Sequence, residues 1–490
     1  MMTEGLAQAE RKMRTAGVAE NAITVFRHYY AQLADGLTGT IPEASISPVT
    51  DLPRLADLRH ATGRTTSTGT TSTGAESALA RTVVIKLNGG LGTSMGMQRA
   101  KSLLPVREGR TFLDLTVAQV LAARAEHGVR LPLVMMDSFA TSADTMAELA
   151  SSPAVRTAGL PLEFVQNQEP KLRADDLTPV EWPAAPDLEW CPPGHGDLYT
   201  ALAGSGALRT LLDAGFRYAA VSNVDNLGAT PSAVLADWFA GTGAPFAMEV
   251  CERTAADRKG GHLAVRTADG RLVLREKAQT GAEDEAAFGD ITRHRYFNTN
   301  NLWLDLAQLA EALEARDGVL GLPLICNRKH VDPTDASSPE VFQLETAMGS
   351  AIEVFEGSAA IVVPRSRFLP VKTTSDLLVL RSDVYRVDGD GTLDRVSPAT
   401  PLVTLAAGPY KLIADFEQHF PHGAPSLREA GSLTVEGDWT FGPQVVVRGD
   451  VVLPATDKPM TVPGGTVLDG TVVNGTALTG GAGALDDTRR

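Results

Sequence analysis

The stretch from Thr82 to Val106 constrains the fold of this chain more than any other. It begins with a short apolar, β-branched run, Val-Val-Ile-Lys-Leu at 83–87, which predicts a buried strand. Four glycines follow, at positions 89, 90, 92 and 96, and a glycine backbone can turn sharply and approach a ligand closely. Successive backbone N–H groups in such a loop bind anions, and Lys101 can add a full positive charge.

The spacing of these glycines leaves two interpretations open. Gly92 and Gly96 stand one residue too far apart for the dinucleotide-binding fingerprint, and no Gly-Lys-Ser or Gly-Lys-Thr follows as in a P-loop. Spacing alone therefore fits a phosphate site and an ordinary tight connection after a strand equally well.

The totals of the chain exclude several classes of protein. A length of 490 residues predicts two or three domains, and 43% hydrophobic residues are typical of a globular protein. The formal net charge of −15 argues against nonspecific binding to nucleic acid or to an anionic membrane. An anionic substrate would then need local lysines or a metal ion.

Cysteine usage and the chain's apolar runs predict a soluble, cytoplasmic protein. The three cysteines lie far apart and show neither metal-ligand spacing nor a disulfide framework, so each is expected to be a small buried hydrophobe: Cys191, Cys251 and Cys326. Residues 4–12 carry charges where a signal peptide would need an apolar core, and no apolar run approaches the roughly 20 residues of a spanning helix.

The first half of the chain predicts an α/β domain with a largely parallel sheet. One or two amphipathic helices are expected within residues 3–35, followed by irregular chain at 37–60 and a flexible Gly/Thr/Ser linker at 63–74. Strands and helices then alternate: a helix at 111–127 with a Thr111–Asp114 capping box, a strand at 131–136, a helix at 141–149 and a strand at 162–165. Ligands of such sheets bind at the carboxyl ends of the strands.

Further elements are expected along the rest of the chain. Asp197 is a candidate N-cap for an apolar-periodic segment at 198–212, a strand ends near Asn223, and another is expected at 246–251. A helix is expected at 343–355. Short Val- and Leu-rich stretches at 431–475 suggest stacked strands of a β-helix, and the tail from Gly480 is expected to be disordered.

The string Leu-Asn-Gly-Gly-Leu-Gly-Thr-Ser-Met-Gly at 87–96 resembles the nucleotide-binding loop of the eukaryotic-type UTP–glucose-1-phosphate uridylyltransferases. Further matches follow in the family's order, from about Glu20 to Tyr385. The resemblance implies a Rossmann-like nucleotidyltransferase domain with a mixed, mostly parallel sheet, plus a C-terminal β-helix domain. The implied domains are residues 1–80 as a helical arm and linker, 81–384 as the catalytic domain, and 385–490 as the β-helix.

Asp225 is the candidate metal ligand. A carboxylate at the end of a strand that faces a phosphate loop suits Mg²⁺, which prefers one or two carboxylates with substrate phosphates and water. A lone Asp-x-Asn fits a turn or a helix cap better. The string Asn-Val-Asp-Asn-Leu-Gly at 223–228 resembles the family's metal-binding strand end, and this implies Mg²⁺ at Asp225.

The resemblance also implies residues for the two substrates. By themselves these are ordinary turn, loop or surface residues. Two lysines, Lys101 and Lys372, take the catalytic positions, the second in a basic, proline-fixed loop at 364–377. The implied UTP-binding residues are Leu87, Asn88, Gly89, Gly90, Lys101, Gln168, Gly194, Asp225 and Lys372. The implied sugar-phosphate residues are His195, Asn223, Gly261, Glu276, Asn298 and Asn300.

The implied reaction is reversible formation of UDP-glucose and pyrophosphate from MgUTP and glucose 1-phosphate. One departure affects the phosphate contacts, because Gln98 stands where the family often has a lysine, and Arg99 is a candidate replacement. The alternatives are a uridylyltransferase for galactose or N-acetylhexosamine 1-phosphate and a catalytically silent nucleotide-sugar sensor. A glycosyltransferase lacks support, since no clear Asp-x-Asp motif is present. The expected partners are these small molecules, with a homo-oligomer through the C-terminal domain as a further hypothesis.

Overall fold

The computed structural model describes residues 4–37, 39–58, 77–254 and 257–470. The predicted linker at 63–74 and the predicted tail from Gly480 lie outside these residues. The chain forms two compact units. Unit 1 comprises Met1–Gly89, Val120–Asn223 and Pro231–Phe368, and unit 2 comprises Gly90–Gln119, Val224–Thr230 and Leu369–Arg490. The predicted domains 1–80, 81–384 and 385–490 divide the chain differently and stay predictions.

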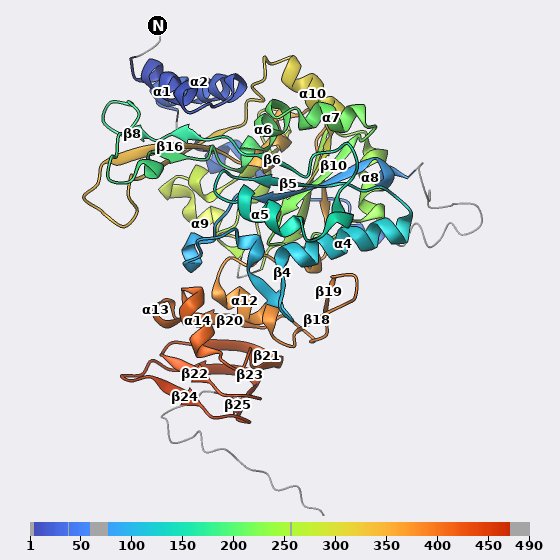
Figure 1. Cartoon of the computed structure of the whole chain (residues 1–490), viewed down its shortest axis with the longest axis vertical. Helices are drawn as coiled ribbons and strands as arrows, with labels where there is room; N and C mark the ends of the chain where they lie inside the picture. The colour runs from blue at the N-terminus through green and yellow to red at the C-terminus, as the bar shows by residue number, and fades with distance from the viewer. Residues whose placement is uncertain (1–3, 38, 59–76, 255–256, 471–490) are drawn as a thin grey trace, which may run out of the picture. The chain divides into compact units, whose positions relative to one another are not determined.

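Unit 1 is built on one mixed sheet (Figure 1). Its main path runs through β1 (Ile46–Pro48), β12 (His262–Arg266), β14 (Tyr296–Asp305), β10 (Tyr218–Asn223), β2 (Thr82–Asn88), β5 (Leu133–Asp137) and β6 (Glu163–Val165). β11 (Phe246–Glu252) pairs with β14 and with β17 (Ala359–Val362), and β13 (Leu272–Arg275) pairs with β12.

The predicted strand at 83–87 is the centre of the parallel part of this sheet. β2 lies between β10 and β5, and both pairings are parallel, as is that of β5 with β6. Val83, Val84 and Ile85 are buried, as expected for a parallel strand covered on both faces. The carboxyl ends of β2, β5 and β10 therefore lie at the same edge of the sheet, at Asn88, Asp137 and Asn223.

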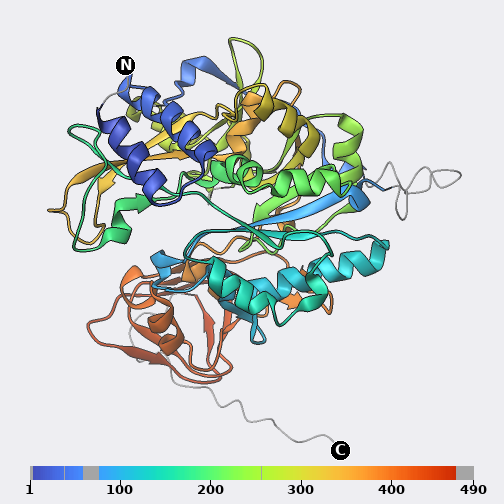
Figure 2. The same ribbon diagram turned by 45° about the horizontal axis from the view of Figure 1, so that its top comes forward.

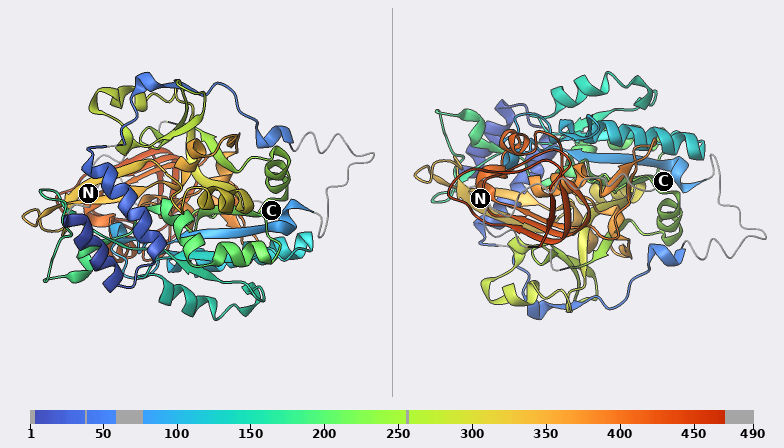
Figure 3. Two further views of the ribbon diagram at one scale, coloured as in Figure 1. Left: turned by 90° about the horizontal axis from the view of Figure 1, so that it is seen from above. Right: turned by 90° about the horizontal axis from the view of Figure 1, so that it is seen from below.

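The predicted N-terminal helices are present as α1 (Glu4–Thr15) and α2 (Glu20–Ala34). They lie side by side (Figures 2 and 3), with their apolar faces in one cluster with Leu172, Leu324 and Leu344. The other helices of unit 1 are α5 (Ser142–Leu149), α6 (Leu198–Gly204), α7 (Ala207–Asp213), α8 (Ala233–Thr242), α9 (Glu285–Phe288), α10 (Leu306–Glu314) and α11 (Ala351–Val354). No helix within the described ranges is long and apolar enough to span a membrane.

The helix predicted at 343–355 is wrong. Gln343 to Thr346 end a strand, β16 (Glu340–Thr346), which pairs antiparallel with β15 (Leu324–His330). Only a 3-10 turn at Met348–Ser350 and the single α-helical turn α11 follow. Backbone pairing with β15 and burial of Val341 and Leu344 outweigh the helical tendency of the Gln-Leu-Glu-Thr-Ala string. β16 also pairs with β8 (Leu172–Arg173), and β7 (Glu169–Pro170) pairs with β9 (Trp190–Cys191).

Three smaller predictions also need correction. The segment 198–212 forms two helices, because the chain turns at Gly206, whose φ is +78°. Asp197 does not cap this segment, since its carboxylate accepts hydrogen bonds from Asn167 instead. The chain at 37–60 contains the strand β1, which pairs with β12.

The cysteines are free thiols, and Cys191 and Cys251 are buried whereas Cys326 is half-buried.

In unit 2 the predicted helix at 111–127 is α4 (Phe112–His127), which continues into unit 1 after Gln119. Its capping box is confirmed: the Thr111 amide donates to Asp114 Oδ2 at 2.8 Å, and the Asp114 amide donates to Thr111 Oγ1 at 3.1 Å. The remaining elements before residue 420 are β3 (Pro105–Arg107), β4 (Arg110–Thr111), α12 (Thr374–Arg381), β18 (Tyr385–Val387), β19 (Leu393–Arg395), β20 (Leu402–Leu405), α13 (Ala407–Tyr410) and α14 (Ile413–His419).

The last part of unit 2 consists of parallel strands. β20, β21 (Ser426–Val435), β23 (Val446–Leu453) and β25 (Val467–Asp469) form one parallel sheet, and β22 (Trp439–Phe441) pairs with β24 (Met460–Val462) in a second. The strands are stacked in chain order within this unit (Figure 1), and buried Trp439, Leu433 and Val451 belong to its core. The β-helix itself stays a prediction.

Candidate functional site

The side chain of Asn88, at the end of β2, faces the protein interior. Its Nδ2 donates to Asp137 Oδ1 at 2.7 Å and to Thr145 Oγ1 at 2.8 Å, and the residue is buried. Any contact of Asn88 with a ligand is therefore made by its backbone. Leu87 lies opposite Asn223 in the parallel pair of β2 and β10, so these two predicted residues are neighbours at the same sheet edge.

Gly89 lies against the side chain of Gln166. A Cβ atom there would lie 2.9 Å from Gln166 Oε1, and the Gly89 carbonyl accepts a hydrogen bond of 3.0 Å from Ser138 Oγ. Gln166 also donates through Nε2 to the Gly194 carbonyl at 2.8 Å. Gln166 thus connects two predicted nucleotide-binding glycines. Sequence analysis identified Gln168, two residues further along the chain, and missed Gln166.

Gly194 is held in a conformation that favours glycine. Its φ is +77°, and a Cβ atom would lie 2.6 Å from the Thr346 carbonyl oxygen. This geometry places the chain of 193–195 directly against β16. The absence of a side chain at Gly194 therefore allows the backbone to lie close to β16 of the protein itself.

His195 is a neutral imidazole with one defined tautomer. The Met348 amide donates to its Nδ1 at 3.0 Å, so the ring proton is on Nε2. Burial lowers the pKa of His195 to about 4, which keeps the ring uncharged near neutral pH. Nε2–H is consequently a fixed hydrogen-bond donor that does not titrate in the physiological range.

The loop that carries Gln168 is anchored on both sides of that residue. The Asn167 amide and Nδ2 donate to the two oxygens of Asp197 at 2.7 and 2.9 Å. On the other side Glu169 is fully buried, and burial, with the charges of Asp197 and Glu345, raises its pKa well above the usual value. Gln168 itself is half-buried, so its amide can contact both the protein and a ligand.

Four predicted sugar residues lie together in unit 1. The Asn298 amide donates to the Gly261 carbonyl at 3.0 Å, and a Cβ atom on Gly261 would lie only 2.4 Å from Glu276 Oε2. Asn298 Nδ2 donates to Asn300 Oδ1 at 2.7 Å, and the Asn300 amide returns a bond of 2.8 Å to Asn298 Oδ1. Asn300 adopts a left-handed conformation, with φ +58°. This cluster offers carbonyl, carboxylate and amide groups to a polyol.

A buried ion pair supports the asparagine strand. Arg367 Nε and Nη2 donate to the two carboxylate oxygens of Glu249 at 2.6 and 2.9 Å. Trp303 Nε1 and Asn301 Nδ2 donate to the same carboxylate at 3.0 and 3.2 Å. Burial alone would raise the pKa of Glu249, but the charge and hydrogen bonds of Arg367 outweigh it and hold the pKa below its usual value. Sequence analysis missed Glu249, although a charge inside the apolar run 246–251 was the available signal.

In unit 2 one predicted cation, Lys101, contacts the predicted carboxylate Asp225. Lys101 Nζ donates to Asp225 Oδ2 at 2.5 Å and to the Val371 carbonyl, and both side chains of the ion pair are 15% exposed. Val371 directly precedes Lys372, so Lys101 connects the segments that carry Asp225 and Lys372. The Lys101 amide also donates to the Gly90 carbonyl at 3.1 Å, which ties the lysine to the glycine loop.

Lys372 stands at the start of α12. Its backbone amide donates to Asp376 Oδ2 at 2.9 Å, and Thr373 and Asp376 form the capping box of the helix. The lysine side chain is exposed. Asn226 fixes the preceding chain by accepting a bond of 2.8 Å from the Leu369 amide through Oδ1. Gln98 and Arg99, where the sequence departs from the resembled family, are also exposed.

The donor set fits Mg²⁺ only with ligands from a substrate. Among the described residues no three or more metal-ligating side chains lie together. Asp225 offers one partly exposed carboxylate, beside the cationic Lys101. A single carboxylate is sufficient for Mg²⁺ when phosphate oxygens and water complete the shell.

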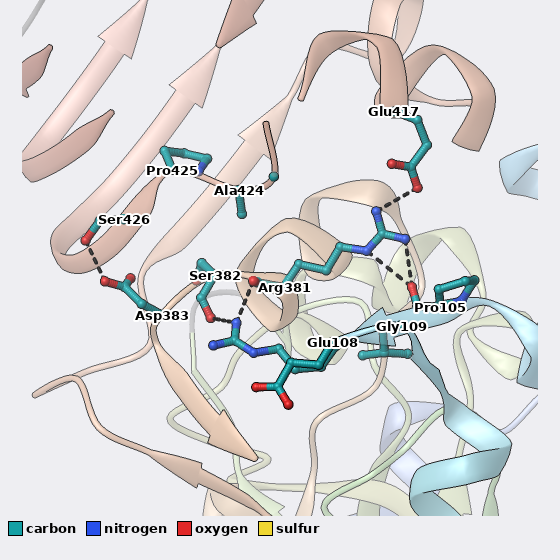
Figure 4. A pocket seen from close by; sticks show the side chains of 13 residues that line it. Pro105, Glu108, Gly109, Arg381, Ser382, Asp383, Glu417, Ala424, Pro425 and Ser426 are labelled. Carbon is teal, nitrogen blue, oxygen red and sulfur yellow. Dashed lines mark hydrogen bonds and ion pairs between the residues drawn. The ribbon is translucent and has the colours of Figure 1, made fainter. Parts of the chain in front are cut away.

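Each unit also contains a cavity of about 700 Å³ lined by other residues. In unit 2 the cavity lies beside the β3–β4 hairpin, the end of α12 and the loop 423–426 (Figure 4). There Arg381 donates to the Pro105 carbonyl and to Glu417 Oε1, each at 2.7 Å. In unit 1 the cavity is lined by His28, Arg316, Glu353 and their neighbours. The predicted site residues are not part of either lining.

Comparisons with known proteins agree with the resemblance found in the sequence. Residues 24–448 match the family described as UTP–glucose-1-phosphate uridylyltransferase. The Saccharomyces cerevisiae enzyme of that name is 40% identical over 387 residues, 78% of this chain and 75% of that protein. The Hordeum vulgare enzyme is 41% identical over 384 residues, 77% of this chain and 78% of that protein.

Solved structures of similar proteins cover nearly the whole chain. A UDP-glucose phosphorylase from Trypanosoma brucei is 44% identical with a TM-score of 0.87, covering 96% of this chain and 100% of its own. A mutant UDP-glucose pyrophosphorylase from Leishmania major in complex with UDP-glucose is 42% identical with a TM-score of 0.88, covering 96% and 100%. The agreement of motifs, fold and length shows that this chain belongs to the UTP–glucose-1-phosphate uridylyltransferase family.

Proposed function

We propose that this chain makes UDP-glucose and pyrophosphate from UTP and glucose 1-phosphate, reversibly and with Mg²⁺. The observation that carries this proposal is the cluster in unit 2, where Lys101 binds both Asp225 and the carbonyl that precedes Lys372. It joins a cation and a carboxylate, the proposed metal ligand, to the segment that carries Lys372, in a chain whose net charge is −15.

The reaction needs alignment and charge neutralisation rather than a base. An oxygen of the sugar phosphate attacks the α-phosphorus of UTP in line, the new P–O bond forms, and the bond to pyrophosphate breaks. The nucleophile is already an anion near neutral pH, so no proton has to be removed. Catalysis then rests on positioned positive charge and hydrogen-bond donors.

The residues of unit 2 suit the phosphate groups. Lys372, exposed at the start of α12, is proposed to contact the sugar phosphate and the α-phosphate, while Lys101 and the backbone of Gly90 hold the other UTP phosphates. Asp225 is proposed to hold Mg²⁺, which supplies charge neutralisation at the phosphates when bound. Lys101 balances the charge of Asp225.

The residues of unit 1 suit the base and the sugar. Gln168 offers the paired donor and acceptor that a uracil edge requires, and the backbone of 87–89 and Gly194 are proposed to contact the nucleotide. The Nε2–H of His195 is proposed to donate to the sugar phosphate. The hydroxyls of glucose are assigned to Asn223, Gly261, Glu276, Asn298 and Asn300, four of which already lie together.

Sugar specificity is tested by pyrophosphate release with a panel of sugar 1-phosphates. We expect rapid release with MgUTP and glucose 1-phosphate, and much slower release with galactose 1-phosphate or N-acetylglucosamine 1-phosphate. A preference for another sugar would keep the reaction and overturn the substrate. Binding of UDP-glucose without turnover of any sugar would favour the silent sensor, against which intact Lys101, Asp225 and Lys372 weigh.

We also propose that the enzyme works in the cytoplasm. We further propose that the parallel strands of unit 2 form a β-helix through which the chain self-associates. The edge strands β20 and β25 carry exposed Leu402 and Val467, 61% and 48% exposed. A light-scattering mass above one chain, reduced to one chain in the double variant Leu402→Lys, Val467→Lys, is the expected result. An unchanged oligomer in that variant would contradict this interface.

A further inference from the structure

Asp137, at the end of β5, is a buried carboxyl group whose two oxygens differ in their hydrogen bonds. Its Oδ1 accepts three hydrogen bonds, from Asn88 Nδ2 at 2.7 Å, Thr145 Oγ1 at 3.0 Å and Thr141 Oγ1 at 3.2 Å. Its Oδ2 is buried and has no hydrogen-bond partner among the described residues. The side chain is fully buried, so an ionised carboxylate here would leave one charged oxygen unsatisfied.

The side-chain amide of Asn88 has an oxygen that could accept the hydrogen bond that Asp137 would donate. Its Nδ2 already donates to Asp137 and Thr145, while its carbonyl oxygen Oδ1 is buried and, within the part of the chain that the structure describes, accepts no hydrogen bond. A carboxylic acid and a primary amide can pair through two hydrogen bonds, N–H to C=O and O–H to C=O. A proton on Asp137 Oδ2 would supply a donor for the second of these hydrogen bonds.

We propose that Asp137 carries a proton on Oδ2 and donates it to Asn88 Oδ1, so that this acid–amide pair positions the first turn of the glycine loop. Burial, with the neighbouring charge of Glu163 on β6, raises the pKa of Asp137 to about 7, which agrees with a retained proton. Among the described residues the carboxyl group has three hydrogen-bond partners: the Asn88 amide on β2, the Thr145 hydroxyl on α5 and the hydroxyl of Thr141, which precedes α5.

The pair acts on the loop through the backbone. Asn88 immediately precedes Gly89, and Ser138, the residue after Asp137, donates to the Gly89 carbonyl at 3.0 Å. Without the proton, Asp137 Oδ2 and the Asn88 carbonyl oxygen would both be acceptors and would repel each other. This repulsion would weaken the contacts that hold Gly89 in place. Asp137 is therefore a positioning residue, and its effect on affinity rests on the proposed role of the loop in binding UTP.

The test compares wild type with Asp137→Asn, whose amide presents the same donor and acceptor at every pH. We expect KM for UTP in wild type to rise about fivefold as the pH increases from 6.5 to 8.5, with a smaller change in kcat. The variant should keep one low KM across this range. Titration of the substrate phosphates, with a second pKa near about 6, is common to both proteins and cancels in the comparison.

Two further measurements separate this inference from the proposed function. Infrared spectra at pH 6 should show a protonated-carboxyl band that Asp137→Asn removes, whether or not the protein turns over UTP. Glu163→Gln should move the rise in KM to lower pH, because it removes the charge that favours the proton. Equal pH profiles for wild type and Asp137→Asn, no infrared difference, or loss of UTP binding in Asp137→Asn as severe as in Asp137→Ala would each overturn the proposal.

Discussion

At the scale of single residues, the site depends on which atoms hold protons. His195 receives the Met348 amide at Nδ1, and burial keeps the pKa of the ring at about 4. Its Nε2–H is therefore available at any pH at which the enzyme would work. Lys101 and Asp225 form an ion pair whose side chains are each 15% exposed, so the proposed phosphate and Mg²⁺ ligands could reach them.

The tautomer of His195 predicts the effect of His195→Leu. Loss of one aligned donor to the sugar phosphate should lower kcat/KM for glucose 1-phosphate about 100-fold. The affinity for UTP, measured by calorimetry, should change less than about twofold, because the assigned contact is to the sugar phosphate. No limb in the wild-type pH profile near the usual histidine pKa should trace to this residue. A fall in UTP affinity equal to the loss in kcat/KM would contradict the assignment.

At the scale of the elements, the strand ends and turns determine the geometry. β2, β5 and β10 end at the same sheet edge, so their last residues lie close together. At Gly194 the backbone of β16 leaves no room for a Cβ atom, whereas at Gly261 the Glu276 carboxylate would have to move. The buried Glu249–Arg367 pair fixes the strand that carries the asparagines.

Two glycines with the same backbone conformation provide a matched test of this packing. Gly194 and Gly206 have φ of +77° and +78°, but only Gly194 would place a Cβ atom against backbone, at 2.6 Å from the Thr346 carbonyl. Gly206→Ala should cost about 1 kcal/mol through backbone strain alone. Gly194→Ala should cost at least about 2 kcal/mol more in denaturant unfolding, since β16 must move. Equal losses would show that the space at Gly194 is not limiting.

The start of α11 predicts a pH effect on stability. Burial raises the pKa of Glu353 to about 7, against the favourable charge of Arg266, and its Oε1 has no partner among the residues described. The pKa of this carboxyl group is higher in the folded state than in the unfolded state. Its contribution to stability is therefore fully present below the unfolded pKa of about 4, and it is lost as the pH rises from about 4 to 7.

The substitution Glu353→Gln removes the titrating carboxyl group, so the variant should not lose this stability as the pH rises. The variant should match wild type within about 0.5 kcal/mol at pH 4.5 and be more stable by up to about 3 kcal/mol at pH 8, measured by urea unfolding. A variant that is equally destabilised at both pH values would mean that the carboxylate is ionised and that its ion pair with Arg266 is favourable.

At the scale of the whole molecule, the sequence predicted the fold class and the family but not every element. The apolar run at 83–87 and its glycines identified β2 correctly because a parallel strand is apolar on both faces. The helix predicted at 343–355 failed because antiparallel pairing with β15, a long-range interaction, decided the structure. Asp197 was mistaken for a cap because its true donor, Asn167, is 30 residues away in the chain.

The candidate site was predicted to a similar extent. Lys101 contacts Asp225 and the chain that precedes Lys372, and Gly261, Glu276, Asn298 and Asn300 lie near one another. The supporting residues Gln166 and Glu249 were missed, since a supporting contact depends on tertiary packing and has no motif of its own. The roles of the individual residues stay proposals that only substitutions can decide.

The most direct test of the account is the rate of pyrophosphate release from MgUTP and glucose 1-phosphate by wild type, Lys372→Ala and the control Lys458→Ala. Both lysines are exposed residues of unit 2, so both substitutions remove one positive charge at little structural cost. We predict that Lys372→Ala lowers kcat at least about 1,000-fold, while Lys458→Ala stays within about twofold of wild type. Equal rates for the two variants would contradict the central claim that Lys372 stabilises the transferring phosphate.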